Sequence, residues 1–151
     1  MNQTFVQRFS SALVAAVALA GVVVTAQADK PTVLVYKTPT CGCCTKWVEH
    51  LQTNGFKVVT QHRDDLTSIR QQQKVPLAVT SCHTALVGSY VVEGHVPAQD
   101  VKKLLAEKPS VKGIGVRGMP IGSPGMEGPN PQRYDTLAFT ADGKTSVFAK
   151  H

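Results

Sequence analysis

The sequence predicts an α/β fold in which short strands alternate with helices. Three observations support this class: a β-rich run at Val33-Leu34-Val35-Tyr36, apolar positions spaced by three and four residues after Cys44, and Gly or Pro between such segments. A length of 151 residues is typical of one domain. The apolar share of 42% is too high for a disordered chain, so we expect a folded core.

The first predicted unit is a strand followed by a helix that begins at a cysteine cluster. Residues 33–36 form the β-rich run, and Thr38-Pro39-Thr40 breaks it. From Cys44 to Leu51 the apolar residues have helical spacing, and Asn54-Gly55 is typical of a helix end. The cysteines are therefore expected to open a helix.

A second strand, a weaker helix and a hairpin follow. Residues 56–62 are predicted as a strand and residues 64–74 as a helix. Residues 84–87 and 90–92 flank Gly88-Ser89, a two-residue turn with Gly first, which is a good hairpin signal.

The last elements are a helix, a long loop and a second hairpin. Residues 97–108 carry apolar positions on one helical face. Residues 109–131 are nearly half Gly or Pro, which favours a loop and argues against both a helix and a central strand. Residues 136–140 and 145–149 are predicted to pair as a C-terminal β-hairpin.

The predicted order up to residue 108 is β-α-β-α-β-β-α. With a Cys-x-x-Cys spacing where the first strand gives way to the first helix, this order is the layout of a thioredoxin-like fold. We therefore expect that fold, extended by a Gly/Pro/Met-rich loop and a C-terminal β-hairpin.

Residues 1–28 are predicted to be a signal peptide. Arg8 supplies a short positive start, Ser11 to Val24 is a small-apolar run, and Ala26-Gln27-Ala28 offers a cleavage site. Cleavage would leave residues 29–151 as a thioredoxin-like metal-binding domain. The alternative is an uncleaved membrane anchor, for which the apolar run is short. We expect export, to the periplasm in a bacterium, with no stable membrane insertion afterwards.

The charge balance does not predict a nucleic-acid partner. The chain has 16 Lys and Arg against 10 Asp and Glu. It contains no Lys/Arg run and no basic stripe interleaved with aromatic residues, which a nucleic-acid surface would need. We interpret the excess positive charge as a contribution to solubility.

The four cysteines are predicted to form one site. Cys41, Cys43 and Cys44 lie at a helix start, where free N–H groups stabilise thiolates, and Cys82 precedes the hairpin that should face this helix. Thiolates serve both disulfide exchange and metal binding. A third adjacent thiol, Cys43, favours a metal cluster, because a two-cysteine redox cycle has no use for it. Alternatively, Cys82 is a buried small residue or forms a structural disulfide.

The neighbouring residues favour copper over zinc. Four thiolates suit either metal, but Met119 and Met126 in the loop add soft thioether sulfurs that favour Cu(I). A packing role for each methionine remains the alternative. His83 and His95 are possible additional ligands or proton carriers, or hydrogen-bonded surface residues. Trp47 is expected to pack beneath the cluster. Three further histidines are expected to be solvated: His50, His62 and His151.

Four ordered motifs resemble a known family, the periplasmic metal-binding family called domain of unknown function 411, which includes the CopG-type copper-resistance proteins. The motifs are Lys37-Thr38-Pro39-Thr40-Cys41-Gly42-Cys43-Cys44, Ser81-Cys82-His83-Thr84-Ala85, residues 90–97, and Gly118-Met119-Pro120 with residues 122–126. The resemblance implies a thioredoxin-like fold, several Cu(I) ions in a thiolate cluster, and interconversion of Cu(I) and Cu(II). By position, it implies four copper ligands, Cys41, Cys43, Cys44 and Cys82.

Three functions are therefore compared. The leading hypothesis is a periplasmic copper-binding protein of copper resistance, with copper ions and other copper-handling proteins as partners, and with copper redox turnover as its possible reaction. The alternative is a thiol-disulfide oxidoreductase that uses Cys41 and Cys44. A third hypothesis is an adaptor domain in which zinc or a disulfide acts as a staple.

Overall fold

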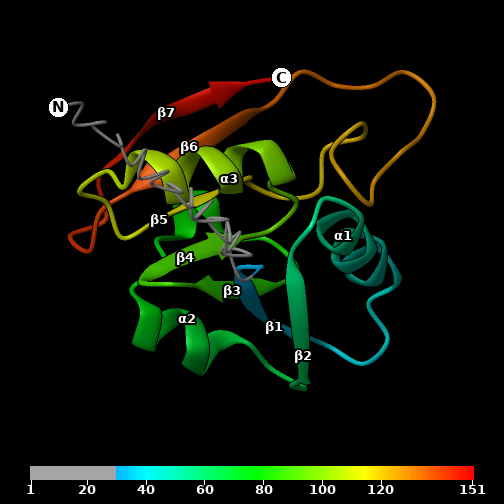
Figure 1. Ribbon diagram of the computed structural model, residues 1–151, viewed down its shortest axis with the longest axis horizontal. Helices are drawn as coiled ribbons and strands as arrows, with labels where there is room; N and C mark the ends of the chain where they lie inside the picture. The colour runs from blue at the N-terminus through cyan, green and yellow to red at the C-terminus, as the bar shows by residue number, and fades with distance from the viewer. Residues whose placement is uncertain (1–29) are drawn as a thin grey trace, which may run out of the picture.

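The computed structural model describes residues 30–151, in which one mixed sheet is covered by helices on both faces (Figure 1). The predicted signal segment, residues 1–28, lies outside the described residues. Within residues 30–151, no helix is both long and apolar enough to cross a membrane.

The sheet of the described residues has seven strands in the order β2-β1-β3-β4-β5-β6-β7. Two neighbouring pairs, β1 with β2 and β4 with β5, are parallel, and the other pairs are antiparallel. The strands are β1 (Thr32–Lys37), β2 (Lys57–His62), β3 (Thr84–Val87), β4 (Tyr90–Glu93), β5 (Gly113–Gly115), β6 (Asp135–Phe139) and β7 (Thr145–Lys150).

The helices follow the predicted pattern. α1 (Gly42–Thr53) begins after Cys41 and ends at Asn54, as its spacing and the Asn-Gly pair indicated. The others in the described part are α2 (Thr67–Gln73), a short 3-10 turn η1 (Leu77–Val79), and α3 (Ala98–Glu107). The predicted α/β class, both hairpins and the helix at the cysteines are therefore confirmed.

The main core lies between the sheet and the helices α1 and α3. Trp47 and Leu51 from α1 and Leu104 from α3 are fully buried against strand residues such as Val35. On the opposite face, Val79 of η1 packs in a smaller cluster with residues of β4 and β6. The larger core holds the start of α1, and so the cysteines, against the sheet.

The prediction that residues 109–131 contain no central strand was wrong. Gly113-Ile114-Gly115 forms β5, which pairs with β4 on one side and β6 on the other. A Cβ atom built on Gly113 would lie 2.8 Å from Phe139 Cζ and closer still to the Val91 backbone. Glycine is required here because the neighbouring backbones approach too closely for a side chain, so a residue typical of loops marks a buried strand.

Gly113→Ala is expected to destabilise the protein by about 1–3 kcal/mol, because the added methyl group overpacks the centre of the sheet. Urea unfolding followed by circular dichroism measures this change. Gly42→Ala is the matched control, since a Cβ there meets no atom within 4 Å. Equal stability of the two variants would contradict the close approach at β5.

Candidate metal centre

Three of the four cysteines are placed by the start of α1. Cys41 is the N-cap: its backbone is extended, its N–H donates to Thr38 O at 3.3 Å, and its Sγ accepts from the Cys44 N–H at 3.3 Å. Cys43 and Cys44 lie in the first turn of the helix. The predicted position of the cysteines at a helix N-terminus is therefore confirmed, and the dipole of α1 favours negative charge on their sulfurs.

Cys82 reaches the same place from the loop that enters β3. Its Sγ lies 3.5 Å from Cys44 Sγ, while Cys43 Sγ lies 3.5 Å from Cys41 Sγ. All four sulfurs lie within 4.8 Å of one another. Two segments that are 38 residues apart at their nearest cysteines thus form one sulfur cluster, as the sequence predicted.

The cluster is partly oxidised in this structure. Cys41 and Cys44 form a disulfide, and Cys43 and Cys82 are free thiols within the described residues. Burial raises the pKa of the Cys82 thiol to about 12, with a further contribution from the nearby Cys43. Cys82 is therefore protonated at neutral pH and must lose that proton to bind a metal.

Both candidate histidines lie against Cys82 and are fully buried. His95 Nε2 is 2.9 Å from Cys82 Sγ, and His83 Nδ1 is 3.3 Å from the same sulfur. His95 Nδ1 lies 2.8 Å from Pro124 O, which can only accept, so Nδ1 carries the proton and the Nε2 lone pair faces the sulfur. Burial lowers the pKa of both imidazoles, which keeps them neutral and able to act as ligands.

His83 has one nitrogen without a hydrogen-bond partner. Its Nε2 is buried and unpaired among the described residues. The ring lies with its centroid 4.3 Å from that of Trp47 and 5.0 Å from that of His95. Trp47 is buried beneath the cluster, as predicted, and donates from Nε1 to Val96 O at 2.8 Å.

The methionine loop lies beside the cluster. Met119 Sδ is 3.9 Å from Cys43 Sγ, and the Met119 side chain is half exposed. Met126 lines a hollow of about 420 Å³ next to Cys43, together with Lys46 and Glu127. The structure therefore brings one methionine sulfur to a cysteine and leaves the other at the edge of the site.

Gly125 fits this loop against the helix start. Its φ is +85°, and a Cβ there would lie 2.6 Å from Cys43 O and 2.9 Å from Trp47 N. Its N–H donates to Glu127 Oε1 at 2.7 Å. The glycine is needed both for its backbone conformation and for the close approach to α1.

Gly125→Ala is expected to displace the loop from α1 and, if the cluster binds Cu(I) as the sequence predicts, to weaken that binding by about tenfold, equivalent to about 1.4 kcal/mol. Gly118→Ala is the matched control: Gly118 also has positive φ, at +67°, but a Cβ there meets nothing within 4 Å. Competition titration with a Cu(I) chelator gives both affinities. Equal losses in the two variants would show that backbone strain alone, and not the contact with α1, is responsible.

One of the three histidines that were predicted to be solvated, His50, is partly buried, whereas His151 is exposed, as predicted, but has polar and stacking partners. His50 Nε2 accepts from the Ala98 N–H at 3.0 Å and so links α1 to α3. His151 Nε2 lies 2.9 Å from Asp100 Oδ2, and its ring stacks on Tyr134. Both form contacts between distant segments, which local sequence does not show. His62 is exposed, as predicted.

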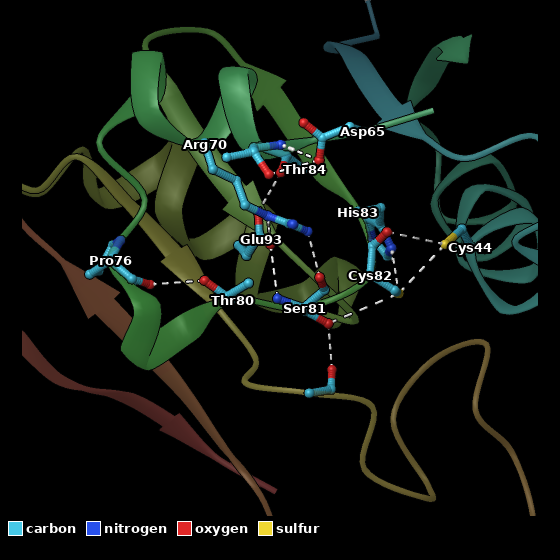
Figure 2. Close-up of polar contacts among 12 residues, drawn as sticks. Cys44, Asp65, Arg70, Pro76, Thr80, Ser81, Cys82, His83, Thr84 and Glu93 are labelled. Carbon is cyan, nitrogen blue, oxygen red and sulfur yellow. Dashed lines mark hydrogen bonds and ion pairs between the residues drawn. The ribbon is translucent and has the colours of Figure 1, made fainter. Parts of the chain in front are cut away.

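Sequence reasoning missed the polar group behind Cys82. Glu93, which is fully buried at the end of β4, pairs with Arg70 of α2 and accepts from the Ser81 N–H and the Thr84 hydroxyl (Figure 2). The available signal was a carboxylate directly after the apolar pair Val91-Val92, since a charged residue in a buried strand requires a partner.

The donor set fits a soft metal ion. Four cysteine sulfurs, a neighbouring thioether and a neutral imidazole nitrogen are grouped in one place. Soft sulfur ligands favour Cu(I), and tetrahedral thiolate sites also accept Zn²⁺. Because the disulfide occupies two of the sulfurs, the full set is available only in the reduced protein.

Comparisons with known proteins identify the family of this chain. A family model described as "Protein of unknown function, DUF411" matches residues 79–126, which include Cys82, both candidate histidines and both methionines. No curated protein matches the chain.

Two solved structures, described as copper resistance protein CopG in Form 2 and Form 1, are 39% and 40% identical to this chain, each with a TM-score of 0.76. Each match covers 81% of this chain and 98% of the other. This chain is therefore a homologue of CopG, and it belongs to the DUF411 family.

Proposed function

We propose that this protein binds Cu(I) through the thiolates of Cys41, Cys43, Cys44 and Cys82 and acts in copper resistance. The observation that carries the proposal is the convergence of four cysteine sulfurs from two separate segments within 4.8 Å. The likeness to copper resistance protein CopG supports copper as the metal. We infer the location from the sequence: residues 1–28 direct export to the periplasm, where other copper-handling proteins are the partners.

The arrangement of the sulfurs suits more than one copper ion. Cys43 and Cys44 are adjacent on a helix, so their side chains leave the axis about 100° apart and do not converge on one point. Thiolates that bridge several ions accommodate such a spread. Met119 and His95 extend the donor set, the first beside Cys43 and the second beside Cys82. Zinc is the less favoured metal because the thioether contributes little to its binding.

The same cysteines could change the oxidation state of copper. Forming the Cys41–Cys44 disulfide from two thiols releases two electrons and two protons, which would reduce two Cu(II) ions to two Cu(I) ions. Cys43 and Cys82 would remain as thiols to hold the product. This chemistry would make the protein a copper oxidoreductase as well as a copper-binding protein.

We also infer a thioredoxin-like core. The sheet order β2-β1-β3-β4, the parallel pair of β1 with β2, and α1 directly after β1 support this assignment. β5, β6 and β7 extend the sheet beyond that core. The segment between β5 and β6 runs beside α1 (Figure 1), and its Met119 Sδ lies 3.9 Å from Cys43 Sγ.

An anaerobic titration tests the copper function. The reduced protein without residues 1–28 is titrated with Cu(I) against a competing chelator, and the loaded protein is examined by X-ray absorption. We expect more than one Cu(I) per chain, sulfur as the main ligand, and short metal–metal distances. Absence of tight thiolate-bound copper would reject the proposal.

A thiol-disulfide oxidoreductase is the second candidate, and the disulfide between Cys41 and Cys44 at the helix start favours it. It predicts that the reduced protein reduces insulin disulfides and that this activity is independent of Cys82. A structural staple is less suitable, because a disulfide three residues apart closes too small a loop to restrict the unfolded chain much.

A further inference from the structure

We propose that Arg70 and Glu93 are a positioning pair that fixes the Cys82 thiol in the sulfur cluster. The inference rests on the proposed copper function, because it concerns how the fourth sulfur of that site is held. Neither residue touches a sulfur. Both act through the backbone of Ser81, the residue before Cys82.

The pair holds both polar groups of the Ser81 backbone. Glu93 Oε1 accepts from the Ser81 N–H at 2.9 Å and from Arg70 Nε at 2.9 Å. The Arg70 guanidinium also donates to Ser81 O. One ion pair therefore fixes the residue before Cys82 from two sides (Figure 2).

The second carboxylate oxygen of Glu93 bonds to a residue on the other side of Cys82. Glu93 Oε2 accepts from the Thr84 hydroxyl at 2.6 Å, so residues on both sides of the Cys82-His83 pair bond to one side chain. Glu93 is fully buried, and the Arg70 side chain is largely buried. Such charge-assisted bonds, shielded from water, restrict the loop more than exposed ones would.

The same arrangement reaches the methionine loop and His95. The Ser81 hydroxyl donates to Gly118 O, next to Met119. A Cβ on Gly94 would lie 2.5 Å from Ser81 Oγ, so only glycine lets the segment before His95 pack directly on Ser81. Ser81 is thus the point at which the segments carrying Cys82, Met119 and His95 meet.

Overall stability is a weak explanation for this pair. The free energy of removing two charges from water offsets much of the free energy gained from their attraction. Buried ion pairs can therefore often be replaced by apolar residues without loss of stability. What an apolar replacement cannot supply is the set of directed bonds to Ser81 and Thr84. The position of the pair directly behind a candidate metal ligand indicates that placement of Cys82 is its role.

The test measures Cys82 accessibility without copper. In a Cys43→Ser background with the Cys41–Cys44 disulfide intact, Cys82 is the one free thiol of residues 30–151. Its alkylation rate with iodoacetamide, followed by mass spectrometry, is expected to rise about tenfold in Glu93→Gln, because reactivity follows exposure. Asp100→Asn is the matched control, a buried carboxylate that bonds Thr136 and His151 away from the site.

A double variant separates positioning from stability. Arg70→Met with Glu93→Leu removes both charges, which is expected to restore the thermal midpoint, yet it cannot bond Ser81. We expect its alkylation rate to stay high and, with Cys43 present, its Cu(I) affinity to stay about tenfold low. If Glu93→Gln alone does not fold, the alkylation rate of this double variant tests the positioning role instead.

Two results would overturn the positioning role: an unchanged alkylation rate in the folded variants, or recovery of the wild-type rate in the double variant. Failure of the copper function is seen separately, as absence of tight Cu(I) binding by the unsubstituted protein. The alkylation readout does not depend on that result.

Discussion

Cys43→Ser is expected to lower the Cu(I) affinity of the reduced protein by at least about tenfold, or about 1.4 kcal/mol, and to lower the number of ions bound. Cys43 Sγ lies between Cys41 Sγ, at 3.5 Å, and Met119 Sδ, at 3.9 Å, so its loss removes the link between the helix start and the methionine loop. A serine hydroxyl is a poor ligand for a soft ion. Chelator competition and X-ray absorption measure both effects.

The same variant separates the two candidate functions. An oxidoreductase that uses Cys41 and Cys44 keeps its insulin-reducing activity in Cys43→Ser, because the disulfide pair is untouched. Thr45→Ala is the control for copper binding: it changes the same turn of α1 and removes a hydroxyl bonded to Cys41 O, but no sulfur. Wild-type copper affinity in Cys43→Ser, together with full insulin reduction, would favour the oxidoreductase.

Much of the site could be predicted because its signals are local. Apolar spacing from Cys44 to Leu51 sets α1, and the break at Thr38-Pro39-Thr40 places Cys41 at its N-cap. The Gly88-Ser89 turn sets the β3–β4 hairpin, which places Cys82 in the loop just before β3. Once strand, helix and hairpin are assigned, the meeting of Cys82 with α1 follows from the topology.

What could not be predicted depends on contacts between distant segments. The strand at β5 consists of residues that favour loops, and only the close approach of Val91 and Phe139 explains them. The partners of His50 and His151, the Ala98 N–H and Asp100, lie far along the chain. These are tertiary effects that override local preference.

The Arg70–Glu93 pair is another contact between distant segments that the sequence did not predict. Its two members are 23 residues apart, in α2 and at the end of β4, and no periodicity relates them. A buried carboxylate indicates that some partner exists, but it does not identify Arg70 or the backbone of Ser81. The sequence therefore predicted which sulfurs form the cluster but not how the Cys82 loop is held.

The redox state of the cluster connects its two chemical roles. The Cys41–Cys44 disulfide and a four-thiolate copper site are mutually exclusive, because the same sulfurs serve both. Cys43 and Cys82 stay reduced in the oxidised form and are only partly exposed. Oxidation therefore leaves two thiols in the cluster, Cys43 beside Met119 and Cys82 beside His95.

Protein carrying the Cys41–Cys44 disulfide is accordingly expected to bind Cu(I) at least about tenfold more weakly than reduced protein, a difference of about 1.4 kcal/mol. Thiol counting defines the two states: two free thiols in the oxidised protein, Cys43 and Cys82, and all four cysteines after reduction. Each state is titrated anaerobically with Cu(I) after removal of the reductant. Renewed reduction should restore the affinity, which excludes irreversible damage.

A Cys41→Ser variant provides the comparison, because it cannot form this disulfide. Its copper affinity should be lower than that of the reduced wild type, since one ligand is missing. In this variant Cys44 could form a disulfide with Cys82 instead, because their sulfurs are 3.5 Å apart. After mild oxidation, the copper affinity is therefore measured only on the fraction of the variant that has kept all its free thiols. Equal affinity of the oxidised and reduced wild-type proteins would mean that Cys41 and Cys44 are not copper ligands, and the site would then reduce to Cys43, Cys82 and their Met and His neighbours.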